Sequence, residues 1–198
     1  MPRLQTDAIG LTALVLIFLA WIVFGLAFLL RKRTPGVQEA KRAPVSSLGI
    51  LLQSVGFMFV WLIGRTQWWP FPPSFVGELV LAVVAVLLAF ASSLFALLAA
   101  RTLGKQWTYR ARVIEGHELV TTGPYSVVRN PIYLGMFGML LATGLVFSRW
   151  WNFLGAILFF LIGNQIRIRA EEKLLRETFG PQFDDYAGRV PAFFPRLF

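Results

Sequence analysis

Five stretches of apolar residues, separated by polar segments, dominate the hydrophobic pattern of this chain. They cover residues 8–30, 46–64, 75–100, 132–148 and 151–165. A helix needs about 20 predominantly apolar residues to cross the hydrocarbon core of a bilayer. The first three stretches reach about that length, whereas the last two are shorter and are joined only by Arg149 and Trp150. The pattern predicts an all-α integral membrane protein with about five transmembrane helices, the last two forming a tight helical hairpin.

The fifth apolar stretch continues into charged residues that keep a helical spacing. Leu174 and Leu175 supply an apolar face to this extension, and Gly180 followed by Pro181 is a strong helix stop. We therefore expect a cytosolic helix that ends near residue 179. The aromatic and proline-rich tail, residues 190–198, cannot form a regular helix and is expected to pack back on the protein or the lipid surface.

The distribution of positive charge predicts the orientation. With the N-terminus outside, segments 31–45, 101–130 and 166–198 lie in the cytoplasm and hold 16 of the 19 Lys and Arg residues. Only Arg3, Arg65 and Arg149 remain outside. Cytoplasmic loops of membrane proteins carry an excess of Lys and Arg, so this orientation is expected. Trp68 and Trp69 then suit the aromatic belt at the outer membrane boundary.

Composition supports a membrane protein and narrows its partners. The chain is 57% hydrophobic and 15% charged, with a net charge of +9, whereas soluble domains carry roughly 25% charged residues. In so apolar a chain we interpret the positive charge as basic loops facing anionic lipid headgroups, not as a nucleic-acid surface.

Several kinds of chemistry are excluded by residues and motifs that the sequence lacks. It has no cysteine and a single histidine, His117, so no metal site and no cysteine nucleophile is expected. It contains no Gly-x-Gly-x-x-Gly motif, no P-loop and no Gly-x-Ser-x-Gly elbow. Charge within the apolar stretches is nearly nil, which argues against an ion pump or a proton relay.

The densest cluster of unusual residues lies at 117–135. Asn130 and Pro131 have the pattern of a helix N-cap followed by proline at the first helical position. The amide-rich start of this helix, with Arg129 beside it, favours an anion, and Tyr125 and Tyr133 can stack on a flat ring or face a cation. A purely structural interpretation stays open, with Asn130 as a cap and Arg129 reaching lipid phosphates.

A second cluster follows the fifth stretch. Arg167 and Glu171 are four residues apart and share a helix face, and Glu172 follows directly. Carboxylates this close to the membrane suit the amine of a zwitterionic ligand. The alternative is a salt-bridged helix surface, with the pairs Arg169–Glu172, Glu172–Arg176 and Lys173–Glu177.

Taken in order, these two clusters resemble the isoprenylcysteine carboxyl methyltransferase family, which is related to the phospholipid N-methyltransferases. The family pattern is His-x-Leu-Val, Gly-x-Tyr, Arg-His-Pro-x-Tyr, a Glu-Glu pair, Phe-Gly and Tyr. The corresponding residues here are His117-Glu-Leu-Val120, Gly123-Pro-Tyr125, Arg129-Asn-Pro-Ile-Tyr133, Glu171-Glu172, Phe179-Gly180 and Tyr186. The ordered match covers roughly residues 101–198, which implies a catalytic region there and three N-terminal transmembrane helices in residues 1–100.

The resemblance implies S-adenosyl-L-methionine as methyl donor, bound without a Rossmann domain by the loop before helix four and by the extension of helix five. Carried over by position, Arg167 faces the methyl acceptor, and Arg167 and Asn130 are the candidate catalytic residues. The candidate cofactor-binding residues are His117, Glu118, Leu119, Val120, Tyr125, Arg129, Asn130, Pro131, Ile132, Tyr133, Glu171 and Glu172.

One residue departs from the family pattern, because Asn130 stands where the family has histidine. Asparagine forms hydrogen bonds but cannot act as a base at neutral pH. A carboxylate acceptor is already ionised at pH 7, whereas an ammonium acceptor must first lose a proton. Asn130 therefore modestly favours a carboxylate acceptor, or leaves the methylation of an amine to another base.

We expect a methyltransferase for a lipophilic acceptor that enters from the bilayer, most simply an isoprenylcysteine-like carboxylate. The alternatives are a phospholipid N-methyltransferase, a membrane reductase that uses NADPH, and a membrane protein without catalytic activity.

Overall fold

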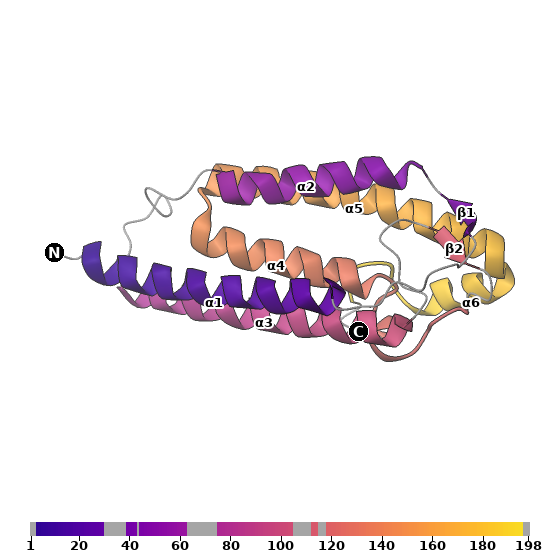
Figure 1. Cartoon of the computed structure of the whole chain (residues 1–198), viewed down its shortest axis with the longest axis horizontal. Helices are drawn as coiled ribbons and strands as arrows, with labels where there is room; N and C mark the ends of the chain where they lie inside the picture. The colour runs from indigo at the N-terminus through magenta and orange to yellow at the C-terminus, as the bar shows by residue number, and fades with distance from the viewer. Residues whose placement is uncertain are drawn as a thin grey trace.

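A computed structural model of the chain describes residues 3–29, 39–42, 44–62, 75–104, 112–114 and 118–195. Five long helices run lengthwise beside one another (Figure 1). They are α1 (Arg3–Leu29), α2 (Ser46–Leu62), α3 (Phe75–Leu103), α4 (Pro131–Phe147) and α5 (Trp150–Phe179). The short elements are β1 (Glu39–Arg42), β2 (Arg112–Ile114), the 3-10 helix η2 (Gly123–Ser126) and α6 (Pro181–Arg189).

The five long helices are apolar, and three of them have the length of a membrane span. Ala8–Leu26, Phe75–Leu103 and Trp150–Phe179 are long and apolar enough to cross a membrane, and Ser46–Trp61 and Pro131–Phe147 are shorter apolar helices. Large apolar side chains point outward along these helices, as a lipid environment allows and water does not. The predicted all-α membrane fold is therefore confirmed, with three of the described helices meeting the length of a span.

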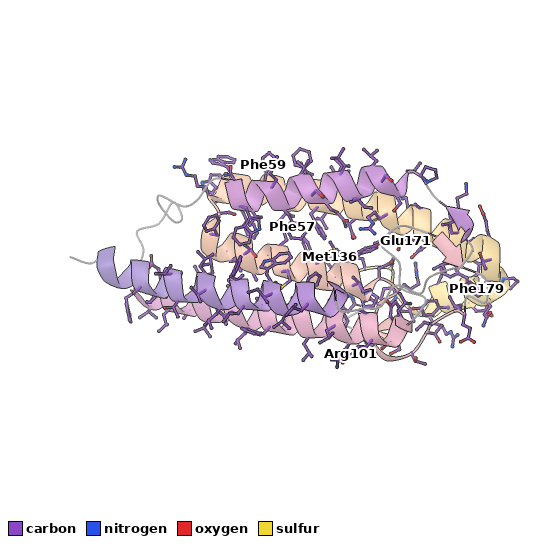
Figure 2. The ribbon with its side chains drawn as sticks, viewed as in Figure 1. Phe57, Phe59, Arg101, Met136, Glu171 and Phe179 are labelled. Atoms are coloured by element: carbon purple, nitrogen blue, oxygen red, sulfur yellow. The ribbon has the colours of Figure 1, made fainter. Side chains whose placement is uncertain are left out.

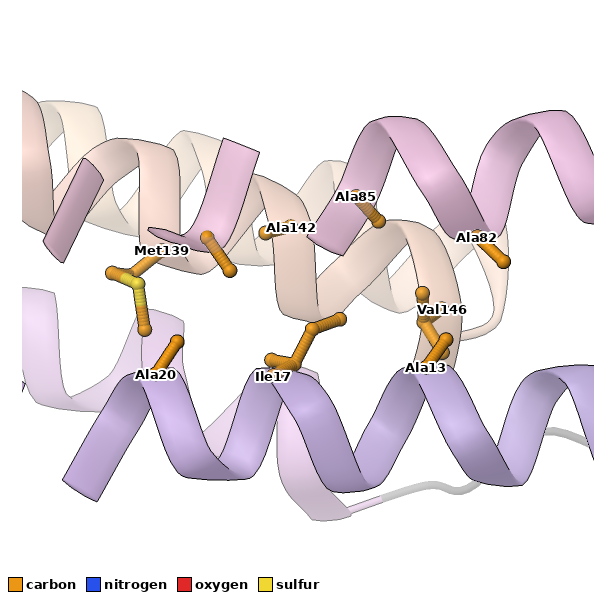
Figure 3. Packing of buried hydrophobic residues seen from close by; sticks show 9 residues of the cluster. Ala13, Ile17, Ala20, Ala82, Ala85, Met139, Ala142 and Val146 are labelled. Atoms are coloured by element: carbon orange, nitrogen blue, oxygen red, sulfur yellow. The ribbon is translucent and has the colours of Figure 1, made fainter. Parts of the chain in front are cut away.

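Helices α1, α3 and α4 form one packed group around small and apolar side chains. Ala13, Ile17 and Ala20 of α1 face α3 and α4 in Figure 3, where Met139 and Ala142 of α4 complete the contact. Small residues allow membrane helices to approach closely. Hydrogen bonds also join these helices: Trp21 Nε1 donates to Thr143 Oγ1 at 3.0 Å, and Ser93 Oγ lies 2.9 Å from the Ala20 carbonyl oxygen and 3.2 Å from Met139 Sδ.

Helices α2 and α5 form a second group, and their backbones come into direct contact at glycines. A Cβ atom placed on Gly163 of α5 would lie 2.6 Å from the Gly49 carbonyl oxygen of α2, and one on Gly56 would lie 2.8 Å from the Ala156 carbonyl oxygen. The Phe57 and Phe160 rings pack edge to face beside this contact. Alanine or any larger residue at these positions would force the two helices apart.

The connection between α4 and α5 is as short as the sequence predicts, since only Ser148 and Arg149 separate them. However, α3 is the main packing partner of α4, and α2 is the main partner of α5. The two helices of the hairpin still touch, because the Phe137 and Phe160 rings stack with centroids 5.5 Å apart. The hairpin thus joins the two helix groups.

All short elements gather at one end of the bundle (Figure 1). There β1 and β2 pair antiparallel, with Arg42 opposite Arg112, and tie the segment after α1 to the segment after α3. The predicted helix stop is confirmed: α5 ends at Phe179, and Gly180 has a φ of +51°, which glycine adopts readily. The sheet and α6 were not expected from the sequence.

Candidate functional site

The residues singled out in the sequence lie at the polar end of the bundle, where the loop before α4 meets the last turns of α5 and the C-terminal tail. His117 lies outside the described residues. Glu118 is exposed, and Leu119 and Val120 are half-buried. Pro131 is buried at the start of α4, and Ile132 packs against Ala96 and Ala100 of α3.

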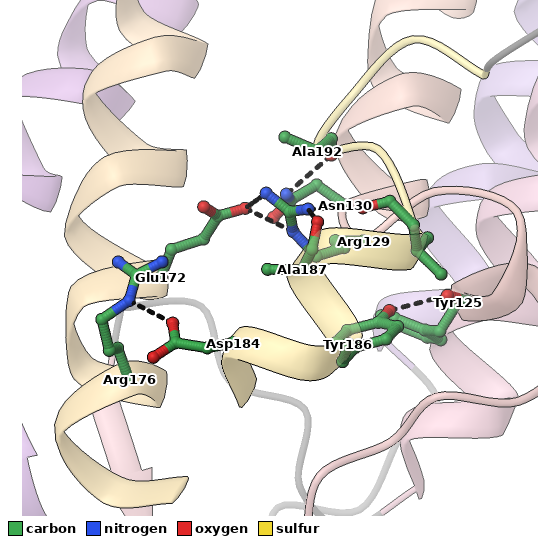
Figure 4. Close-up of polar contacts among 10 residues, drawn as sticks. Tyr125, Arg129, Asn130, Glu172, Arg176, Asp184, Tyr186, Ala187 and Ala192 are labelled. Carbon is green, nitrogen blue, oxygen red and sulfur yellow. Dashed lines mark hydrogen bonds and ion pairs between the residues drawn. The ribbon is translucent and has the colours of Figure 1, made fainter. Parts of the chain in front are cut away.

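Arg129 joins the loop to α5 and to the tail (Figure 4). Its Nε and Nη2 lie 2.9 and 2.8 Å from Glu172 Oε1, and both side chains are largely buried, at 12% and 16% exposure. Nη1 donates to the carbonyl oxygens of Ala187, at 2.9 Å, and Val190. Arg129 therefore binds a carboxylate and two carbonyls of its own chain, and in this structure it acts as a brace.

Asn130 takes the N-cap position of α4, as predicted, but its side chain does not cap the helix. Its Nδ2 instead donates to the Ala192 carbonyl at 2.8 Å, and the Arg129 backbone N–H donates to the Pro191 carbonyl at 2.9 Å. The amide thus fastens the tail to the start of α4. The tail, residues 190–198, was expected to pack back on the protein or the lipid surface. Its described part, residues 190–195, packs on the protein, with Phe193 buried against Phe137.

Tyr186 of α6 holds the loop from the other side. Its hydroxyl donates to the Tyr125 carbonyl at 2.6 Å, and both rings are buried. Burial raises the pKa of Tyr186 to about 12, so the hydroxyl keeps its proton at neutral pH and can donate. Residues near both ends of the family-like pattern are thereby brought into contact.

Glu172 and Arg176 are paired with residues outside α5. Glu172 contacts Arg129, which is 43 residues away, and Arg176 Nε lies 2.7 Å from Asp184 Oδ1 of α6 (Figure 4). The acidic pair on α5 is thereby divided. Glu172 faces the loop and tail, whereas Glu171 faces α4.

Glu171 forms a compact group with Tyr133 and Arg167 on the inner side of α5. Figure 2 shows Glu171 on the side of α5 that faces α4. The Tyr133 hydroxyl donates to Glu171 Oε1, Arg167 Nη2 lies 3.7 Å from the same oxygen, and Arg167 Cζ stands 4.6 Å from the Tyr133 ring centroid. A cation, a carboxylate and an aromatic ring thus meet where the apolar bundle becomes polar.

Gln53 and Asn164, which were not among the candidate site residues, connect this group to α2. Arg167 Nη1 donates to Gln53 Oε1 at 3.0 Å, and Gln53 Nε2 donates to Asn164 Oδ1 at 3.4 Å. Gln53 and Asn164 are each only 2% exposed. Their sequence signal was present, because polar residues inside apolar helices are costly and often functional.

The candidate site therefore has two parts. One is a brace made by Arg129, Asn130, Glu172 and the tail, which fixes the loop. The other is the group of Tyr133, Arg167 and Glu171, whose charges can bind and orient a small polar ligand beside the apolar interior.

Comparison with known proteins adds a family match over this region. The sequence model of the phospholipid methyltransferase family matches residues 80–182, which include most of α3 and all of η2, α4 and α5. Both parts of the candidate site therefore fall mainly within the matched residues.

Curated relatives match over a similar extent. The nickel-cobalt-cadmium resistance protein NccN of Alcaligenes xylosoxydans xylosoxydans is 45% identical over 101 residues, 48% of this chain and 45% of that protein. The cobalt-zinc-cadmium resistance protein CzcN of Cupriavidus metallidurans is 39% identical over 100 residues, 48% of this chain and 44% of that protein. Protein-S-isoprenylcysteine O-methyltransferase B of Arabidopsis thaliana is 34% identical over 99 residues, 48% of this chain and 49% of that protein. The match thus spans about half the length of these curated relatives.

Proposed function

Since the chain belongs to the phospholipid methyltransferase family, we propose that it transfers a methyl group from S-adenosyl-L-methionine to a lipophilic acceptor. The observation that carries this proposal is the convergence of Tyr133, Arg167 and Glu171 at the polar end of the bundle, within the matched residues. This position gives a polar cofactor access from water and an apolar acceptor access from lipid.

The residues at this position fit the cofactor chemically. When bound, S-adenosyl-L-methionine supplies an electrophilic methyl group on a positively charged sulfur. The half-buried Glu171 carboxylate can bind an ammonium group, and the Tyr133 ring can face a cation. Glu118, Leu119 and Val120 precede η2 on the same loop and can border the cofactor, together with Tyr125, Pro131 and Ile132.

Arg167 is the residue we assign to the acceptor. Its guanidinium is held between α2 and α5, close to the apolar interior. A guanidinium keeps its charge at all relevant pH values and pairs well with carboxylates. An isoprenylcysteine-like acceptor combines a carboxylate with a long apolar chain and matches this position. Relatives named as protein-S-isoprenylcysteine O-methyltransferases, among them those of Arabidopsis thaliana, Schizosaccharomyces pombe and Saccharomyces cerevisiae, favour the same acceptor chemistry.

Asn130 has a structural role in the proposed site and does not act as a base. Its amide is bound to the Ala192 carbonyl, which keeps the tail over the start of α4. A carboxylate acceptor needs no base, so alignment of the reacting groups and exclusion of water suffice for transfer. An amine acceptor, as in phospholipid N-methylation, requires a base that Asn130 cannot supply.

We further propose that the site faces the cytoplasm and that the N-terminus lies outside. The segments with 16 of the 19 Lys and Arg residues then lie in the cytoplasm with the candidate site. Single cysteines in the native cysteine-free chain test this orientation. A cysteine at Thr122 should be protected from impermeant thiol reagents in intact cells, and one at Gln67 should label. Labelling of the Thr122 position without permeabilisation would place the site outside.

Methyl transfer from labelled cofactor tests the proposed function. We expect the purified protein to methylate an N-acylated S-farnesylcysteine, and to leave the corresponding amide, which lacks the carboxylate, unmodified. Transfer to phosphatidylethanolamine vesicles but not to the carboxylate would establish the N-methyltransferase alternative. No transfer to either, in a protein that binds the cofactor, would contradict both acceptor assignments.

A further inference from the structure

Gln53 is a buried polar residue in an otherwise apolar helix, and it lies before the residues matched by the family. Helix α2 covers Ser46–Leu62, whereas the family match begins at residue 80. The side chain is 2% exposed at the contact between α2 and α5. A glutamine amide buried in a membrane bundle needs hydrogen-bond partners, and their identity shows what the residue can do.

Both the nitrogen and the oxygen of the Gln53 side-chain amide form hydrogen bonds with α5. Nε2 donates to Asn164 Oδ1 at 3.4 Å, which leaves Oε1 to accept from Arg167 Nη1 at 3.0 Å. Asn164 and Arg167 are three residues apart on α5, so one glutamine bridges successive positions of one helix face. The hydrogen bond with Gln53 Oε1 ties the Arg167 guanidinium to α2, in addition to its contacts with Glu171 and Tyr133.

The backbone is shaped to allow this contact. A Cβ atom on Gly163 would lie 2.9 Å from the Gln53 backbone nitrogen and 2.6 Å from the Gly49 carbonyl oxygen. A Cβ atom on Gly49 would meet the Arg167 side chain at Cγ. The two glycines bring α2 close enough to α5 for a glutamine side chain to reach the guanidinium and leave little room for Arg167 to move.

We propose that Gln53 is a positioning residue that holds Arg167 in place for the methyl acceptor, so that α2 belongs to the acceptor side of the site. This inference rests on the proposed function, in which Arg167 contacts the acceptor. Loss of the Gln53 oxygen removes one hydrogen bond from the Arg167 guanidinium and leaves Glu171 in place. The substitution should therefore affect the acceptor and not the cofactor. Acceptor binding should weaken while cofactor binding stays unchanged.

The test uses three variants of the full chain in detergent. Gln53→Met keeps the length of the side chain and removes the amide. Gln53→Glu keeps an acceptor oxygen at the same place. Thr143→Val is the control, since it removes the acceptor of the partly buried Trp21 hydrogen bond in the other helix group. Each variant is measured for S-adenosylhomocysteine affinity, for kcat and KM with N-acylated S-farnesylcysteine, and for hydrogen exchange of the Arg167 guanidinium by NMR.

We expect Gln53→Met to raise the acceptor KM about tenfold or more, the usual effect of losing a hydrogen bond to a charged group. S-adenosylhomocysteine affinity should change by less than about twofold. Guanidinium exchange should accelerate in Gln53→Met and stay slow in Gln53→Glu and Thr143→Val. An Arg167→Lys variant assigns the NMR signal of the Arg167 guanidinium, because that signal should be missing from its spectrum.

The possible failures are distinguishable. If the native protein binds cofactor and methylates the probe, but Gln53→Met behaves like Thr143→Val in every measurement, Gln53 has no positioning role. If the native protein methylates no probe, the proposed function fails on its own. The exchange measurement then still decides whether Gln53 holds Arg167, and unchanged exchange in Gln53→Met overturns the inference.

Discussion

The two helix groups of this bundle are held together in different ways. Helices α1, α3 and α4 meet through alanine, isoleucine and methionine side chains, with the Trp21–Thr143 bond as a polar contact. Helices α2 and α5 meet at glycines and carry the polar chain of Gln53, Asn164 and Arg167. One interface is therefore built mainly for packing, and the other also positions a charge.

The difference between the two interfaces indicates that buried polar side chains mark functional positions in a membrane bundle. Burial of apolar surface does not drive helix association in lipid, so close packing of small residues suffices for stability. Buried polar side chains are expensive there and are kept when they serve a purpose. The polar chain of the second group leads through Arg167 to Glu171, whereas the first group contributes Tyr133 to the site from the start of α4.

Substitutions of Glu171 and Arg167 should change ligand affinity and methyl transfer the most, and they should distinguish the roles of the two residues. Loss of a hydrogen bond to a charged group costs about 1.5–3 kcal/mol, or roughly ten- to a hundredfold in affinity. Glu171→Gln should weaken S-adenosylhomocysteine binding on that scale, as measured by calorimetry. Arg167→Ala should leave this affinity nearly intact and reduce methyl transfer to the acceptor.

A purely structural role for the two residues predicts another outcome. Both variants would then lose a similar small amount of thermal stability and retain normal turnover. That result would show the site assignment to be wrong while leaving the fold intact.

A second test addresses the close contact of α2 and α5. Gly163→Val places a branched side chain against the Gly49 carbonyl and the Gln53 backbone, so we expect a loss of about 1–3 kcal/mol in stability from overpacking. Gly25→Ala is the control, because its Cβ atom meets nothing within 4 Å. Thermal unfolding in detergent compares the two. Equal melting temperatures would mean that the helices do not approach as closely as described.

The smallest change in stability is expected at the contact between α6 and the loop before α4. Tyr186→Phe removes the hydroxyl that donates to the Tyr125 carbonyl and leaves that buried acceptor with one bond fewer. A net loss of about 1 kcal/mol is expected for such a hydrogen bond. The loop that begins at Glu118 should then show faster amide hydrogen exchange, while α1 and α3 stay unchanged. Uniform acceleration in all helices would instead indicate a general loss of stability.

The sequence predicts the helices well because their apolar stretches are continuous and their ends carry strong signals. The stretch 75–100 corresponds to Phe75–Leu103, and the stop at Gly180 and Pro181 lies where α5 ends. Asn130 also precedes α4 as expected. These features depend on neighbouring residues and can be predicted from local sequence.

Long-range contacts could not be predicted in the same way. The short connection between α4 and α5 suggested that these helices pair with each other, but each packs mainly against an earlier helix. Arg129 binds the carbonyls of Ala187 and Val190, and a carbonyl carries no residue-specific signal. Gln53 was visible as a polar residue in an apolar stretch, but its partner Arg167 lies 114 positions away.

We propose that the polar end of this bundle binds an adenosyl cofactor through the group of Tyr133, Arg167 and Glu171. Calorimetry of the detergent-purified protein with S-adenosyl-L-methionine, S-adenosylhomocysteine and NADPH tests it most directly, with Glu171→Gln measured in parallel. We expect both adenosyl ligands to bind, Glu171→Gln to bind them more weakly, and NADPH to give no heat of binding. Binding of NADPH with no response to either adenosyl ligand would contradict it.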